Sequence, residues 1–132
     1  RQHQDLRTEN DIVYGDTIEF VDFEYARKLT GLNVAALASL AKAPAPPMEV
    51  EISGRVTANT TLHWTPVKDA VNYKIYWRLT DAPQWTNSKE VGDVKEYTLN
   101  NIVIDNYYFG VASVSADGYE SPVVFPGPAG RF

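Results

Sequence analysis

The residues best suited to hold a catalytic metal are the two histidines, His3 and His63. Hydrolysis by a pair of zinc ions needs about five protein ligands, usually two histidines and three carboxylates, together with a general base. His63 falls in a predicted strand, where the alternation of side chains turns it outward. The chain has no cysteine, so disulfides and thiol chemistry are excluded. We therefore expect no complete catalytic site and no cofactor within this chain alone.

Acidic side chains near the N-terminus are a second source of metal ligands, and they include Asp5, Asp11, Asp16 and Glu19. They lack the spacing of a calcium loop, which alternates acids around a central glycine and ends on a glutamate. We interpret them as a solvated acidic loop, and a ligand role is the less favoured alternative. The sequence also contains neither a glycine-rich phosphate loop nor a nucleophile elbow.

Tyr76, Arg78, Trp85 and Tyr108 are the candidate binding residues. Tyr76 and Arg78 alternate with inward residues on one predicted strand, Tyr108 lies on the outer face of another, and Trp85 is expected nearby. Exposed aromatic side chains on a sheet are often incidental. Tyrosine, tryptophan and arginine are also enriched in protein interfaces. Both interpretations stay open, an incidental cluster and a docking patch.

Composition limits the partners of the chain. It has 132 residues, of which 44% are hydrophobic, enough for one domain with an appendage. A net charge of −5 without a basic run makes nucleic acid a poor partner. No apolar run reaches the ~20 residues that cross a bilayer, so we expect no membrane span. We take Arg1 as an internal cut point in a longer polypeptide, with a processed N-terminus as the alternative.

The first 22 residues predict an extended acidic loop with a turn at Gly15 and Asp16. Asp22 is the predicted N-cap of a helix over residues 23–41. Apolar side chains recur there at three- and four-residue spacing, and they are Tyr25, Leu29, Leu32, Ala36, Leu37 and Leu40. A lone helix of this kind is marginal in water, so we expect this stripe to pack on the rest of the chain or to form a homodimer through the helix.

The prolines of residues 44–47 end the helix and predict a semi-rigid spacer. Beyond them, turn signals separate seven predicted strands, at residues 48–53, 60–64, 72–79, 84–91, 96–99, 106–115 and 121–125. The predicted fold is mainly β, a seven-stranded immunoglobulin-like sandwich preceded by an acidic loop and one long helix. The predicted organisation is a loop-and-helix region 1–43, the spacer 44–47, the sandwich 48–126 and a tail 127–132. The predicted core consists of Leu62, Trp64, Tyr73, Ile75, Trp77, Tyr97, Leu99, Tyr107, Phe109 and Val111.

Residues 46–126 resemble a fibronectin type III domain. The resemblance rests on Trp64 within Leu-His-Trp-Thr-Pro, on the alternating Tyr73, Ile75 and Trp77, and on Leu99 followed by Tyr107-x-Phe109-x-Val111. The closing Asp-Gly-Tyr-Glu-Ser-Pro run is also typical of that family. The resemblance implies that the Tyr107 hydroxyl bonds to the backbone upstream.

The first 45 residues resemble the C-terminal tail of the co-catalytic zinc aminopeptidases, the secreted leucyl aminopeptidase type. The resemblance rests on His3-Gln4-Asp5, on Phe20-Val21-Asp22-Phe23-Glu24-Tyr25, and on the alanine- and leucine-rich run 32–41. It implies that His3 is the final zinc ligand of an intact parent enzyme. Some members of that family carry a fibronectin-type domain after the last catalytic helix, and the resemblance implies the same order here.

Two functions are expected from these resemblances. The first is a non-catalytic C-terminal accessory module of a secreted zinc aminopeptidase, which braces the catalytic domain or positions the enzyme. Its location would be secreted, periplasmic or at the cell envelope, its partner would be the parent's catalytic domain, and zinc would belong to the parent. The alternative is a stand-alone protein- or carbohydrate-binding sandwich.

Overall fold

The computed structural model describes residues 6–54 and 56–127. The chain divides into two compact units, an N-terminal unit, Arg1–Leu37, and a sandwich unit, Ala38–Phe132. The two units differ in how they are stabilised. None of the described residues 6–37 is buried, whereas the sandwich unit encloses a continuous apolar core.

The N-terminal unit begins with a short hairpin, where an extended loop was predicted. Strands β1 (Arg7–Glu9) and β2 (Ile12–Tyr14) pair antiparallel. The two residues between them, Asn10 and Asp11, both have positive φ, at 49° and 62°, the conformation that closes a tight two-residue hairpin. Strands of three residues are too short to show a period of two, which is why the sequence pattern missed them.

Helix α1 (Phe23–Lys42) follows the 3₁₀ turn η1 (Ile18–Phe20). The predicted N-cap is confirmed, because an Asp22 side-chain oxygen accepts the Tyr25 N–H at 2.9 Å. The helix starts where predicted and ends one residue later. None of its residues is buried, and Leu32 and Leu37 are each 67% exposed. The expected cover for this stripe, from the sandwich or from a second copy, stays a prediction.

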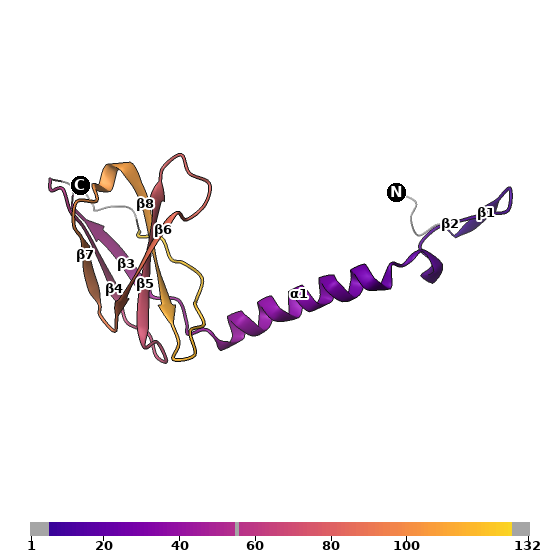
Figure 1. The fold of residues 1–132 in the computed structure, drawn as a ribbon, viewed down its shortest axis with the longest axis horizontal. Helices are drawn as coiled ribbons and strands as arrows, with labels where there is room; N and C mark the ends of the chain where they lie inside the picture. The colour runs from indigo at the N-terminus through magenta and orange to yellow at the C-terminus, as the bar shows by residue number, and fades with distance from the viewer. Residues whose placement is uncertain (1–5, 55, 128–132) are drawn as a thin grey trace. The chain divides into compact units, whose positions relative to one another are not determined.

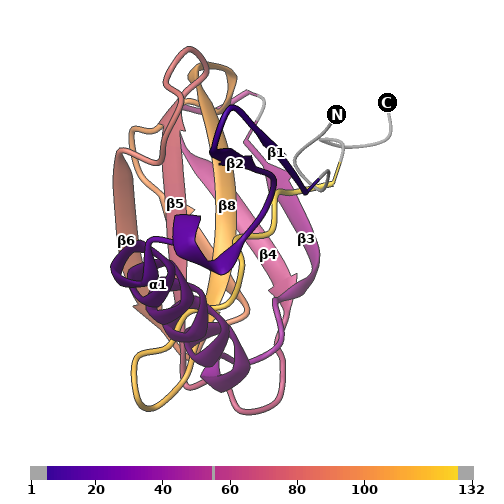
Figure 2. The ribbon, with the colours of Figure 1, turned by 90° about the vertical axis from the view of Figure 1, so that its right-hand side faces the viewer.

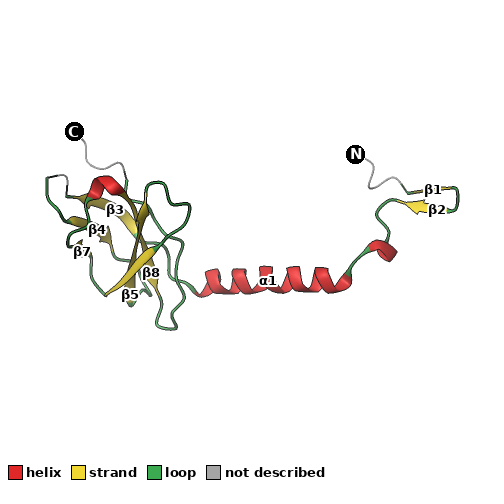
Figure 3. Ribbon diagram, turned by 45° about the horizontal axis from the view of Figure 1, so that its top comes forward, coloured by secondary structure: helices red, strands yellow, loops and turns green. Residues whose placement is uncertain are grey.

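The sandwich consists of two three-stranded antiparallel sheets (Figures 1 and 2). One sheet has the order β3-β4-β7, and the other has the order β6-β5-β8. Their bounds are β3 Met48–Ser53, β4 Thr60–Thr65, β7 Glu96–Leu99, β6 Asn87–Gly92, β5 Asn72–Leu79 and β8 Tyr107–Val114. A 3₁₀ turn, η2 (Ile104–Asn106), leads into β8 (Figure 3). Three of the predicted strands have the observed bounds.

The core lies between the two sheets and contains most of the residues predicted for it. Val50, which was not predicted, joins it, while Trp77, Tyr97 and Tyr107 are only partly buried at its margin. Trp64 and Tyr73 pack across the sheets with ring centroids 5.3 Å apart. Among the described residues, the tyrosine that ties backbone to the core is Tyr73, whose hydroxyl accepts the Val67 N–H at 2.9 Å, and not Tyr107.

The seventh predicted strand, residues 121–125, forms no continuous strand pairing: the closing segment contacts β8 through isolated bridges at Glu120 and at Val124. Pro122 has no N–H to donate to a strand pairing, and the Ser113 N–H is accepted by the Ser121 hydroxyl at 3.0 Å, in place of a backbone carbonyl. Further on, Gly127 donates its N–H to the Val50 carbonyl of the opposite sheet at 2.9 Å. The closing segment therefore joins both sheets along one side of the sandwich.

The proline segment is packed on the sandwich within the same unit. Pro44 and Pro47 are buried. The Ser113 hydroxyl of β8 donates to the Ala45 carbonyl at 2.5 Å. Just before them, the Lys42 ammonium lies 5.0 Å from the centroid of the Tyr119 ring and donates to its hydroxyl at 3.2 Å. Residues 42–47 are thus held by specific contacts.

Candidate functional site

The structure brings the four predicted binding residues together on the outer face of the β6-β5-β8 sheet. Arg78 and Tyr108 are cross-strand neighbours on β5 and β8. The Arg78 guanidinium carbon lies 4.8 Å from the Tyr108 ring centroid and 5.6 Å from that of Trp85. The same guanidinium donates to the Ala82 carbonyl, which fixes the turn before Trp85. The cation is therefore held by two aromatic rings.

Trp85 is the centre of this cluster. Its ring centroid lies 5.9 Å from that of Tyr76 and 5.3 Å from that of Phe125, a residue that the sequence reasoning missed. Trp85 can reach across the sheet because Gly110 presents no side chain beneath it. Strand β6 begins at Asn87, later than predicted, since the chain first places Trp85 over the sheet. We call Tyr76, Arg78, Trp85, Tyr108 and Phe125 the aromatic ladder.

One end of the ladder is fixed by a carboxylate that the sequence reasoning also missed. Glu120 accepts hydrogen bonds from Lys74 at 2.7 Å and from the Tyr76 hydroxyl. Burial disfavours the Glu120 carboxylate, but these two bonds and the Lys74 charge outweigh it, so the pKa of Glu120 lies below its ordinary value. The bond to Glu120 raises the pKa of Lys74, and burial raises the pKa of Tyr76.

The ladder exposes part of its aromatic surface and uses the rest internally. Tyr108 is 47% exposed and Phe125 is 53% exposed, whereas Tyr76, Arg78 and Trp85 are partly buried. The Trp85 plane is inclined at 46° to Tyr76 and at 35° to Phe125. Tilted rings that contact one another do not form the flat platform on which a sugar ring stacks. The exposed rim matches the aromatic and arginine composition of protein interfaces better.

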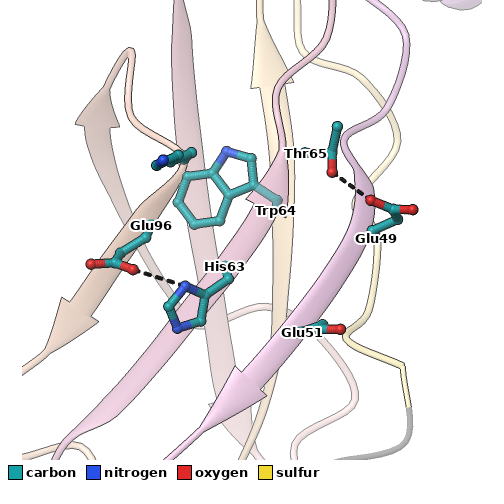
Figure 4. A pocket seen from close by; sticks show the side chains of 7 residues that line it. Glu49, Glu51, His63, Trp64, Thr65 and Glu96 are labelled. Atoms are coloured by element: carbon teal, nitrogen blue, oxygen red, sulfur yellow. Dashed lines mark hydrogen bonds and ion pairs between the residues drawn. The ribbon is translucent and has the colours of Figure 1, made fainter.

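The opposite sheet carries an acidic groove on its outer face (Figure 4). The residues that line it are Glu49, Glu51, His63, Trp64, Thr65, Lys95 and Glu96. Glu51, His63 and Glu96 stand side by side across β3, β4 and β7. His63 Nδ1 lies 2.8 Å from a Glu96 carboxylate oxygen, which confirms that this histidine faces outward.

Histidine and glutamate are zinc ligand types, but the groove does not gather them into a metal site. Within residues 6–54 and 56–127, no group of three or more His, Cys, Asp or Glu side chains could hold a metal ion. His3, the zinc ligand implied by family resemblance, lies outside the described residues.

No helix in the described part of the chain is both long and apolar enough to cross a membrane.

Sequence comparison places the chain beside a group of fungal proteins. It is 43% identical over 131 residues to a probable zinc metalloprotease of Pyrenophora teres f. teres, covering 97% of this chain and 27% of that protein. It is 46% identical over 130 residues to one of Leptosphaeria maculans, covering 96% and 30%. The chain thus spans 27% and 30% of the length of these curated relatives. No protein-family model matches.

Comparison with solved structures confirms the fold class. The twitchin kinase region of C. elegans is similar with a TM-score of 0.53 and 20% identity, over 65% of this chain and 16% of that one. A fibronectin type III domain of the human collagen alpha-1(XX) chain gives 0.50 and 18%, over 69% and 93%. The chain is therefore a region similar to part of fungal probable zinc metalloproteases, folded as a fibronectin type III-like sandwich with one N-terminal helix.

Proposed function

We propose that this chain is the C-terminal accessory region of a secreted zinc-dependent aminopeptidase. In this proposal the N-terminal unit completes a catalytic domain that precedes Arg1, and the sandwich braces that domain. The longer protein would remove N-terminal residues from peptides, and zinc bound there would supply the activated water. Among the described residues, no group of three or more His, Cys, Asp or Glu side chains could hold that metal. His3 would be its last ligand in the intact protein.

The observation that carries the proposal is the exposed apolar surface of the N-terminal unit. Large apolar side chains there are exposed along the hairpin, the 3₁₀ turn and the helix, including Leu6, Ile18, Phe20, Phe23, Leu32 and Leu37. Large apolar side chains exposed in this number are typical of a surface that a partner covers. The alignments to the fungal relatives include this unit, because they cover 96–98% of the chain. In the proposal, a part of the longer protein that corresponds to the unaligned part of those relatives covers this apolar surface.

The ladder supports a bracing role for the sandwich. Tyr108 and Phe125 offer exposed rings, Tyr108 against the fixed Arg78 and Phe125 against Trp85. Aromatic residues and arginine are enriched at the centres of protein interfaces. Replacing both rings by serine should lower the thermal stability of the longer protein more than that of the isolated chain. Serine at Val103, an exposed apolar residue that is not part of the ladder, is the matched control.

The second candidate function is an independent protein- or carbohydrate-binding module; the exposed rings of Tyr108 and Phe125 favour its protein-binding form. Titration with oligosaccharides and Tyr108→Ala would separate the two. Saturable sugar binding that Tyr108→Ala abolishes would favour this second function.

The test of the enzymatic proposal uses the longer protein, obtained by recovering the reading frame upstream of Arg1. We expect it to release a chromogen from an aminoacyl substrate and to lose that activity with a chelator. Substitution of His3 by alanine should abolish hydrolysis, whereas His63→Ala should leave it unchanged. A longer protein that cleaves only internal peptide bonds would contradict the aminopeptidase assignment.

A further inference from the structure

A sequence motif with no role in the function proposed above lies where the loop after β3 enters β4. Residues 59–61 read Asn-Thr-Thr, which fits the acceptor pattern Asn-x-Ser/Thr with a central residue other than proline. No other asparagine in the sequence is followed two residues later by serine or threonine. We infer that Asn59 is an N-glycosylation site, an inference that rests on the proposed secretion.

The fold leaves the reacting atom of Asn59 available. Asn59 is partly buried in the last position before β4, and its Oδ1 accepts the Asn101 N–H at 2.9 Å. Because only an oxygen can accept that bond, Nδ2 is the branch turned away from Asn101. No described residue accepts a hydrogen bond from Nδ2. The amide nitrogen can therefore carry a sugar while the bond that fixes the loop is kept.

The hydroxyl of Thr61 indicates when the modification occurs. In the folded chain it shares a 2.8 Å hydrogen bond with the Thr98 hydroxyl of β7. Thr98 is 37 residues further along the chain. During synthesis from the N-terminus, the acceptor segment emerges well before β7 can pair with β4. The threonine is then free for the transferase, and later pairing encloses only its hydroxyl.

The position of Asn59 suits a bulky substituent. It lies where β4 begins, beside the end of β7, as the pairing of Thr60 with Leu99 shows. The proline segment meets the sandwich at the opposite end, near Ser113 and Tyr119. The aromatic ladder belongs to the other sheet. A glycan on Asn59 therefore leaves both the ladder and the attachment of the helix uncovered.

The transfer of the sugar to Asn59 requires one co-substrate, an oligosaccharide linked to a lipid through pyrophosphate. A bond forms between Asn59 Nδ2 and the anomeric carbon of the first sugar. The bond from that carbon to the pyrophosphate oxygen breaks, the lipid pyrophosphate leaves with the electron pair, and the amide loses one proton. No oxidation or reduction occurs.

The test is to secrete the full chain from yeast behind a heterologous leader and to weigh it before and after peptide N-glycosidase. We expect the added mass of a single oligosaccharide of variable size. The enzyme should remove it and convert Asn59 to aspartate. Asn59→Gln and Thr61→Val should lack it, Thr61→Ser should retain it, and Asn100→Gln, an exposed neighbour outside the motif, should retain it.

A secreted, folded chain with unmodified Asn59 would overturn the inference, as would a glycan that survives Asn59→Gln. Tryptophan fluorescence checks that each variant is folded. Because the leader is supplied, this result is independent of the enzymatic proposal. A glycosylated Asn59 in a protein without aminopeptidase activity would leave this inference standing and remove the proposed function.

Discussion

At the residue scale, Glu120 joins the closing segment to the outer face of the β6-β5-β8 sheet. Its two partners, Lys74 and Tyr76, lie two residues apart on β5, so one carboxylate fixes both side chains. Because the pKa of Glu120 is lower in the folded chain than its ordinary value of 4.5, the folded state binds its proton less readily. Its stabilising contribution is complete above that value and is lost as the pH falls through the folded pKa.

Replacing Glu120 by glutamine should therefore lower the unfolding free energy at neutral pH and flatten its decline below pH 4.5. Urea denaturation at a series of pH values measures both effects. Asp117→Asn, an exposed acid in the neighbouring turn, is the matched control and should preserve the wild-type slope. Equal slopes for Glu120→Gln and the wild type would show that the Glu120 contacts contribute nothing.

Gly110 tests the packing beneath the ladder. A methyl group at this position would overlap Val123 Cγ1 and would lie 3.3 Å from both Trp85 Cη2 and the Val124 carbonyl. Gly110→Ala should therefore destabilise the sandwich by about 1–3 kcal/mol, the usual cost of overpacking. The midpoint of urea unfolding measures this. Gly31→Ala in α1, where nothing lies within 4 Å, is the control and should leave the sandwich transition in place. A Gly110→Ala chain as stable as the wild type would contradict the close approach.

At the scale of elements, the strands were largely predictable, because alternation identified the buried side of β4 and β5 correctly. The exceptions have local causes. The last predicted strand does not form a regular strand pairing, because Pro122 lacks an N–H and the Ser121 side chain accepts the Ser113 N–H. Strand β6 starts later than predicted because Trp85 packs on the sheet first. Alternation placed Tyr76, Arg78 and Tyr108 on one face, with Trp85 expected nearby. Phe125 and Glu120 reach that face from an irregular segment that has no period to read.

The ladder makes a prediction about Arg78, whose planar cation contacts two rings. Arg78→Lys keeps the charge but loses the stacking geometry and the bond to Ala82, so it should destabilise the chain by about 1–2 kcal/mol. Arg78→Met retains much of the side-chain packing and serves as the comparison. Thermal unfolding monitored by tryptophan fluorescence measures both. Full stability of Arg78→Lys would mean that a compact ammonium suffices.

At the scale of the whole molecule, hydrophobic patterning predicted a sandwich with its own core and a helix whose apolar stripe needs cover from the sandwich or from a second copy. The stripe is exposed in the structure, and the proposed function assigns its cover to a preceding domain instead. The exposed side chains of the N-terminal unit and the greater length of the relatives both support an expectation about stability. The sandwich should be stable by itself, and the N-terminal unit should depend on the rest of the longer protein.

Hydrogen exchange tests this claim most directly, by comparing the isolated chain with the longer protein. In the isolated chain we expect the amides of α1 and of the β1–β2 hairpin to exchange rapidly, while those of β4, β5 and β8 are strongly protected. In the longer protein the α1 amides should become protected as well. Protection of α1 in the isolated monomer equal to that in the longer protein would contradict the account, because the helix would then need no cover from a preceding domain.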